Sequence, residues 1–134
     1  MPTGETTAMK IEAIRIPGTE RAVSHVRRWC LDQLGDDHPV LDDALLCLSE
    51  LVTNAMRYTD SGQGGQVHVE LSFSERAVRV EVLDNGGSAT VPCLADVDEE
   101  GVSGRGLRIV SFLASAWGAD RRGRGHAVWF ELRG

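Results

Sequence analysis

The sequence lacks long apolar runs, paired cysteines and an excess of positive charge, and each absence excludes a class of protein. No apolar run approaches the roughly 18 residues that a transmembrane helix needs. The first ten residues, MPTGETTAMK, contain no apolar segment followed by a cleavage site, so no signal peptide is predicted. We therefore expect a cytoplasmic protein with no membrane partner.

The three cysteines, Cys30, Cys47 and Cys93, are odd in number and widely spaced. This pattern argues against a disulfide framework and does not fit a zinc site. Cys30 and Cys47 fall in segments with a helical, partly apolar pattern. We expect both to be buried and to pack as small hydrophobic residues.

Positive charge is too scarce for a general nucleic-acid binder, because the net charge is −6 and phosphate neutralisation needs clustered cations. The charge is unevenly distributed, with acidic runs over residues 32–43 and 96–100. Solvated surface is the ordinary interpretation of these charges. The alternative is that some of the late arginines face a bound anion; these are Arg105, Arg108, Arg121, Arg122 and Arg124.

The apolar patterning of the 134 residues predicts one domain over residues 9–134, after a disordered segment over residues 1–8. The predicted elements are a strand over 9–18, a helix from a cap at Thr19 to Leu34, a helix over about 40–58, strands over 67–74 and 77–84, a helix over 107–118 and a hairpin within 117–133. Strands that arrive in hairpins form a mostly antiparallel or mixed sheet. We therefore predict an α/β (α+β) two-layer sandwich whose sheet is covered on one face by three helices.

The second predicted helix carries two polar residues that its structure does not require. Glu50 and Asn54 are four residues apart and so lie on one face. With Asp43, Cys47 and Arg57 they form a stripe beside the apolar one. An amide oxygen suits Mg²⁺, and a carboxylate one turn away suits a proton acceptor. Taken alone, the pair is better explained as a solvated surface.

Two glycine-rich segments flank an irregular stretch of about 20 residues, a length that is typical of a functional lid. The first, VLDNGG, ends a strand at Asp84, which either caps a turn or accepts a hydrogen bond from an exocyclic amine. The second, GVSGRGL, places Gly104, Arg105 and Gly106 at a helix start, where free backbone amides can bind phosphate. Such a segment is as often a plain turn, and it is neither a dinucleotide fingerprint nor a P-loop.

Together, ELVTNA, VLDNGG and SGRGLRIV resemble the N, G1 and G2 boxes of the ATPase fold shared by gyrase, histidine kinases and the MutL group. Within this GHKL, or Bergerat, fold the chain resembles the anti-sigma-factor serine/threonine kinase family. The boxes follow in the family's order and spacing. The resemblance extends from the first strand to the closing VWFEL.

The resemblance implies roles for individual residues. Glu50 would be the catalytic base and Asn54 the Mg²⁺ ligand. Asp84 would accept a hydrogen bond from the adenine amino group, and Gly86 would let the base approach closely. The other residues expected to bind the nucleotide, mostly near its phosphates, are Arg57, Gly104, Arg105, Gly106 and Leu107.

The same resemblance implies ATP and Mg²⁺ as cofactors and a lid over about residues 88–103. It implies a homodimer that binds a sigma factor, a small anti-anti-sigma antagonist protein, or both, without contacting nucleic acid directly. The expected function is an ATP-binding serine/threonine protein kinase that regulates transcription as an anti-sigma factor by partner switching.

The last strand departs from the family pattern. The family usually carries a threonine there that helps fix the adenine-binding aspartate, whereas this chain has His126 and Ala127. We expect that Ala127 removes one buried hydrogen bond and so weakens nucleotide binding by about 1 kcal/mol or more. His126 is more often a core or surface residue in such a place than a catalytic one. The alternative function is therefore a nucleotide-gated, non-enzymatic partner-binding module. A third possibility, the catalytic piece of a histidine kinase, is disfavoured because no dimerisation helices are predicted.

Overall fold

The computed structural model describes residues 9–58, 65–84, 102–122 and 125–134, with the backbone alone described at 57–58, 102–105 and 121–122. The predicted disordered segment 1–8, Gly86, Cys93 and the lid up to residue 101 lie outside these residues. The elements in chain order are β1 (Lys10–Pro17), α1 (Ala22–Leu34), α2 (Leu41–Tyr58), β2 (Gln66–Phe73), β3 (Ala77–Asp84), α4 (Val102–Leu113), β4 (Ala116–Arg122) and β5 (Gly125–Arg133).

The five strands form one antiparallel sheet in the order β1-β2-β3-β5-β4. Both predicted hairpins are present, and β5 lies between its hairpin partner β4 and the earlier strand β3. The β3–β5 register sets Val82 opposite Val128 and Leu83 opposite Ala127. This order therefore brings the last residues of β3 beside the first residues of β5.

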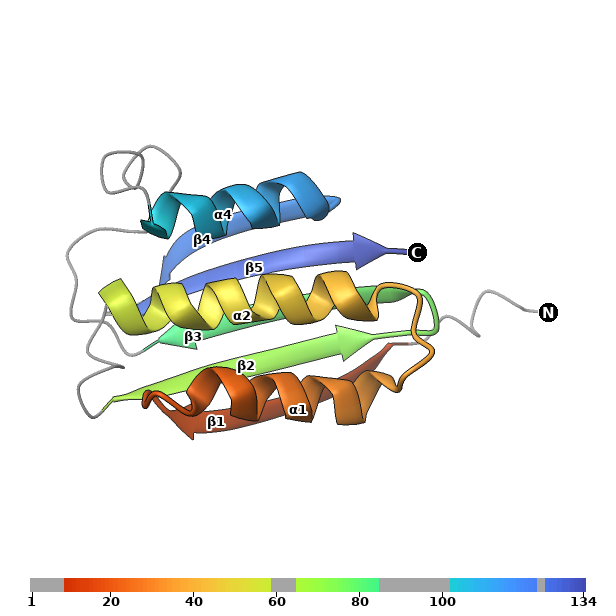
Figure 1. Ribbon diagram of the computed structural model, residues 1–134, viewed down its shortest axis with the longest axis horizontal. Coiled ribbons are helices and arrows are strands. Elements are labelled where there is room, and N and C mark those ends of the chain that lie inside the picture. Colours follow the sequence, from red (N-terminus) through yellow and green to blue (C-terminus); the bar gives the residue numbers. More distant parts are fainter. Residues whose placement is uncertain (1–8, 59–64, 85–101, 123–124) are drawn as a thin grey trace.

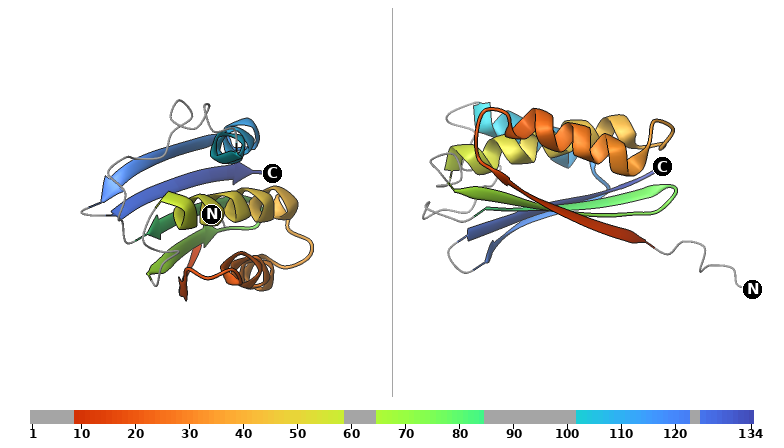
Figure 2. Two further views of the ribbon diagram at one scale, coloured as in Figure 1. Left: turned by 60° about the vertical axis from the view of Figure 1, so that its left-hand side comes forward. Right: turned by 90° about the horizontal axis from the view of Figure 1, so that it is seen from below.

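The three helices of the described part cover one face of the sheet (Figures 1 and 2). In Figure 1, α1 lies over β1 and β2, α2 over the middle of the sheet, and α4 beside α2 over β4 and β5. The core between the layers contains alternate strand residues such as Val69, Val80 and Phe130, which meet Leu48 and Leu51 of α2. The predicted two-layer α+β sandwich is confirmed. None of the helices in the described ranges is long and apolar enough to cross a membrane.

The start of α1 differs from the prediction. Thr19 does not cap the helix with its side chain; its backbone carbonyl instead accepts a hydrogen bond from the N–H of Ala22 at 2.9 Å. The N-cap residue is Arg21, which makes no side-chain cap bond. The predicted stop at Gly35 is confirmed: its φ of +87° suits glycine, and its N–H donates to the Leu31 carbonyl.

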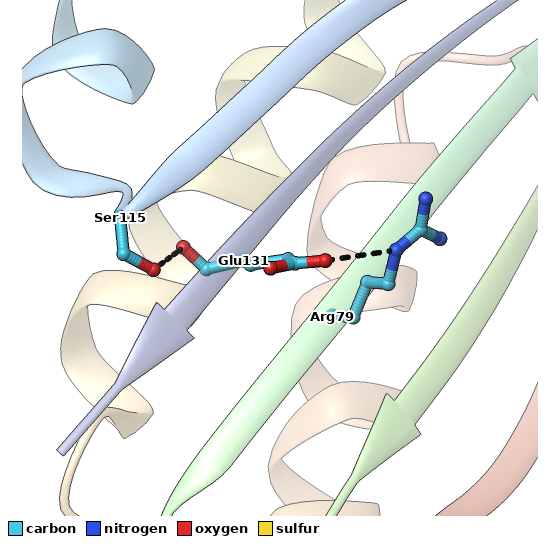
Figure 3. Close-up of polar contacts among 3 residues, drawn as sticks. All are labelled: Arg79, Ser115 and Glu131. Carbon is cyan, nitrogen blue, oxygen red and sulfur yellow. Dashed lines mark hydrogen bonds and ion pairs between the residues drawn. The ribbon is translucent and has the colours of Figure 1, made fainter.

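The third helix is shifted by five residues from the predicted 107–118. It begins at Val102, so Gly104 and Gly106 lie inside its first two turns instead of preceding it. It ends at Leu113 because the chain then joins the sheet: the backbone N–H and the hydroxyl of Ser115 both donate to the Glu131 carbonyl, at 2.8 and 3.0 Å. Figure 3 shows the hydroxyl contact together with the ion pair between Glu131 and Arg79.

Candidate functional site

Several element ends meet at one end of the molecule. In Figure 1 the last turn of α2, the arrowhead of β3, the beginning of α4 and the beginning of β5 all lie at the left-hand side. These are the elements that carry the predicted site residues. The fold therefore gathers segments that are distant in the sequence.

Helix α2 places Asn54 inside the protein and Glu50 at its margin. The side of α2 that carries Leu48, Leu51 and Ala55 is packed into the core. Asn54 is only 3% exposed, and Glu50 one turn earlier is half-buried. The interpretation of this pair as a solvated surface is therefore excluded for Asn54.

Helix α4 packs against α2 at Gly106. A Cβ added there would lie 2.8 Å from Oε1 of Glu50 and 3.5 Å from Nδ2 of Asn54. The backbone of Gly106 thus faces both predicted site residues, and no larger residue fits without moving Glu50. Leu107, the next residue, is fully buried and anchors the helix in the core.

The amide of Asn54 is left without a protein partner. Its Nδ2 atom is buried and makes no hydrogen bond within the described part of the chain. Buried polar groups are nearly always hydrogen-bonded, so an orphaned amide points to a ligand. Because the two ends of an amide are distinguished only by their hydrogen bonds, either its N–H or its oxygen can meet that ligand.

The thiol of Cys47 lies one turn before Glu50 on the same side of α2. Cys47 is completely buried, as predicted, and burial raises the pKa of its thiol to about 12. The carboxylates of Asp43 and Glu50 add to this rise in pKa. Cys47 therefore stays neutral beside Glu50 at physiological pH and packs as a small hydrophobic residue.

At the end of β3, the side chain of Asp84 is only 4% exposed. Its Oδ1 accepts a hydrogen bond from the backbone N–H of His126 at 3.2 Å. The imidazole of His126 is completely buried, with Nδ1 3.5 Å from the same oxygen. A solvent-facing turn aspartate would not be so enclosed, so Asp84 is a buried acceptor at the end of a core strand.

The β3–β5 register corrects one expectation about the last strand. Ala127 is paired with Leu83 and lies on the opposite side of the sheet from Asp84, because successive strand residues face opposite sides. The assignment of a lost Asp84 hydrogen bond to Ala127 was therefore wrong. The residue beside Asp84 is His126, a core histidine. Its importance was missed because the lateral order of β3 and β5 is not visible in the sequence.

The remaining predicted residues are placed less fully. Gly104 and Arg105 lie in the first turn of α4, and Arg57 lies in the last turn of α2, with the backbone alone described. Free amides in a first helical turn can bind an anion, which is consistent with the predicted phosphate site. Gly86 lies outside the described residues.

Comparisons with known proteins identify the family and the fold. Residues 16–132 match the family described as the histidine kinase-like ATPase domain. The chain belongs to this family. An ATPase domain binds ATP, so ATP is the ligand that this histidine kinase-like ATPase domain is expected to bind.

A solved structure has the same fold. The crystal structure of the RsbU and RsbW domains of Rv1364c from Mycobacterium tuberculosis superposes with a TM-score of 0.65 at 22% sequence identity. The match covers 92% of this chain and 32% of that chain, so the histidine kinase-like ATPase domain spans about a third of the larger protein. No curated protein matches the chain by sequence.

Proposed function

We propose that this chain is an ATP-dependent serine/threonine protein kinase that acts as an anti-sigma factor by partner switching. Membership of the histidine kinase-like ATPase family supports the nucleotide, and the sequence boxes support the kinase. The observation that carries the proposal is the contact of Gly106 with Glu50 and Asn54, which joins the predicted base, the predicted metal ligand and the start of α4 in one place.

The residues divide the chemistry between them. Asp84 binds the adenine amino group from the end of β3, and the first turn of α4 directs backbone amides at the phosphates. Glu50 accepts the proton of the attacking hydroxyl as the phosphoryl group is transferred. A half-buried carboxylate suits this role, and Glu50 makes no hydrogen bond or ion pair within the described residues that would neutralise it.

The donor set around Asn54 fits Mg²⁺ bound in company with phosphate. No group of three or more His, Cys, Asp or Glu side chains capable of holding a metal is found in the described ranges, so the described side chains alone form no metal cage. Mg²⁺ typically takes one or two protein ligands and shares phosphate oxygens and water. Asn54 would hold it, and the bound ion would neutralise phosphate charge.

The proposed partners are suggested by the resemblance of the sequence boxes to the anti-sigma-factor kinase family. A sigma factor binds in one nucleotide state, and a small antagonist protein is phosphorylated on serine or threonine in another. A homodimer is the expected assembly. The argument for a non-enzymatic module was that Ala127 removes a hydrogen bond to Asp84. That argument no longer applies, because Ala127 does not lie beside Asp84.

The test is phosphotransfer to candidate antagonist proteins encoded near this gene, with labelled ATP and Mg²⁺. Wild type should label one of them on serine or threonine, and Glu50→Gln should bind ATP with unchanged affinity but transfer at least about a hundredfold more slowly. A Glu50→Gln variant that transfers phosphate at the wild-type rate would remove Glu50 from the mechanism. A wild type that binds ATP and sigma factor without any transfer would favour the non-enzymatic module.

A further inference from the structure

His126 is a buried polar residue for which the proposed function has no role. Its ring is completely buried against Asp84, and neither ring nitrogen has a hydrogen-bond partner within the part of the chain that the structure describes. Leaving an imidazole dry and unpaired costs free energy that a leucine or valine at this position would not. The ring therefore needs an explanation that core packing does not supply.

The position of the ring follows from strand register. Leu83 is paired with Ala127, so Asp84 and His126 are the next pair along the ladder. Val82 and Val128, two residues away on their strands, face the helices, and strand alternation places Asp84 and His126 on that same side. A register slip of one residue would set Ala127 in this place, so the contact is specified by the whole β3–β5 pairing.

The contact has a preferred protonation pattern. If Nδ1 carries the hydrogen, it points a positive group at the carboxylate, whereas a lone pair on Nδ1 would repel it. The Nδ1–Oδ1 separation of 3.5 Å is longer than a good hydrogen bond, so an N–H at Nδ1 would act on the carboxylate by electrostatic attraction alone. The backbone N–H of His126 donates a hydrogen bond to the same Oδ1 at 3.2 Å, so the main chain and the ring of one residue both lie against one oxygen of Asp84.

We propose that His126 is a positioning residue that orients the Asp84 carboxylate toward the exocyclic amine of the base and so favours 6-aminopurines over purines that lack the amine. The inference rests on the proposed nucleotide site. The backbone N–H fixes one oxygen regardless of the side chain, and the ring restrains the rotation of the carboxylate about it. Without the ring, Asp84 keeps its place at the end of β3, but its carboxylate is held less firmly in the orientation that an amine donor needs.

The test compares the affinities of ADP and of its analogue without the 6-amino group, purine riboside diphosphate, by calorimetry. Wild type should prefer ADP. His126→Phe keeps the ring shape without polar atoms and should reduce that preference about tenfold, whereas His126→Asn, whose amide nitrogen stands in for Nδ1, should keep most of it. Leu132→Ala is the matched control: it truncates a core residue on the same side of β5 at the far end, where it is paired with Val78, and should lower the melting temperature without altering the preference.

The outcomes separate this inference from the proposed function. If wild type binds neither nucleotide, the nucleotide site itself is wrong, and the role of His126 is wrong with it. If wild type prefers ADP and Asp84→Asn abolishes the preference while His126→Phe retains it, the role of His126 alone is overturned. In the Asp84→Asn background, His126→Phe should cause no further loss of preference, because the two residues act as a unit. If the Phe variant does not fold, His126→Gln replaces it in the test. The Gln amide lies near the place of Nε2 and not near that of Nδ1, so this variant should lose the preference for ADP that His126→Asn keeps. A preference equal to that of His126→Asn would refute the inference.

Discussion

A methyl group added at Gly106 should reduce phosphotransfer while leaving the fold intact. The new Cβ would lie 2.8 Å from Oε1 of Glu50, where ordinary van der Waals contact begins at 3.4 Å. The Glu50 carboxylate must therefore move by about 0.6 Å or turn to another rotamer, which costs about 0.5–1.5 kcal/mol. The contact with Asn54 is ordinary at 3.5 Å, so Asn54 can stay in place.

The stability cost is offset within the same helix. Alanine in place of glycine inside a helix gains about 0.8–1 kcal/mol of intrinsic propensity. Gly106 needs no special backbone conformation, because Gly35 is the only glycine with positive φ in the described ranges. The free energy of unfolding of Gly106→Ala should therefore stay within about 1 kcal/mol of wild type.

The catalytic cost has no such offset. A misplacement of about 1 Å at a reacting group can lower a rate about a hundredfold. We expect Gly106→Ala to turn over ATP with its protein acceptor about ten- to a hundredfold more slowly. ATP affinity should change much less, because Asp84 and the rest of α4 are untouched.

Three measurements check this: urea unfolding, ATP calorimetry and phosphotransfer. Ser111→Ala is the control, because it adds helix propensity on the same helix but removes only the hydroxyl contact to the Arg108 carbonyl. It should transfer phosphate at the wild-type rate. A Gly106→Ala variant with wild-type turnover would refute the claim that Glu50 must stay against Gly106. A variant whose free energy of unfolding falls by more than about 2 kcal/mol would show that the glycine is needed for packing alone.

Three further predictions concern stability. Burial raises the pKa of Cys30 to about 12, so the folded thiol stays protonated while the unfolded one ionises above about pH 9. Stability is lost over this window as pH rises, and between pH 7 and 10 wild type should lose about 1 kcal/mol more in urea unfolding than Cys30→Ala; equal losses would contradict this. Gly118→Ala places a Cβ 2.8 Å from the indole nitrogen of Trp129 and should destabilise the protein by about 1–3 kcal/mol. ATP affinity should not change, because both residues face away from the helices. A loss of ATP affinity would count against that placement. Arg79→Ala removes an ion pair to Glu131 at 3.3 Å and a cation–π contact to Trp129. Because both charged side chains are more than a third exposed, the free energy of unfolding should fall by about 1 kcal/mol or less, and by less still at high salt. A loss of stability that salt does not change would exclude this electrostatic origin.

Local patterning was sufficient for most of the elements. Alternation in residues 67–74 and 77–84 predicted the β2–β3 hairpin, and the 3.6-residue period predicted α2 to within one residue at its start. The buried cysteines were equally predictable, since Cys30 and Cys47 occupy apolar positions of helical stretches. These features depend on neighbours in the sequence, which periodicity reports directly.

Features set by distant contacts were not predictable from the sequence. Two glycines in the first two turns of α4 lower its helix propensity, so the sequence places the start at Leu107; packing of Gly106 against Glu50 overrides that preference. The end of α4 is set by Ser115 joining Glu131 in the sheet. The Asp84–His126 contact depends on β5 being inserted between β3 and β4, and a linear pattern does not specify that lateral order.

The central claim of the proposed function is that the buried carboxylate of Asp84 binds the adenine of a nucleotide at the end of β3. Calorimetric titration of ATP and ADP, with and without Mg²⁺, into wild type and Asp84→Asn tests it most directly. We predict micromolar, Mg²⁺-sensitive binding by wild type and a loss of about ten- to a hundredfold or more in the variant, because a hydrogen bond to a charged group contributes about 1.5–3 kcal/mol. No binding by wild type, or equal affinity in Asp84→Asn, would contradict the account.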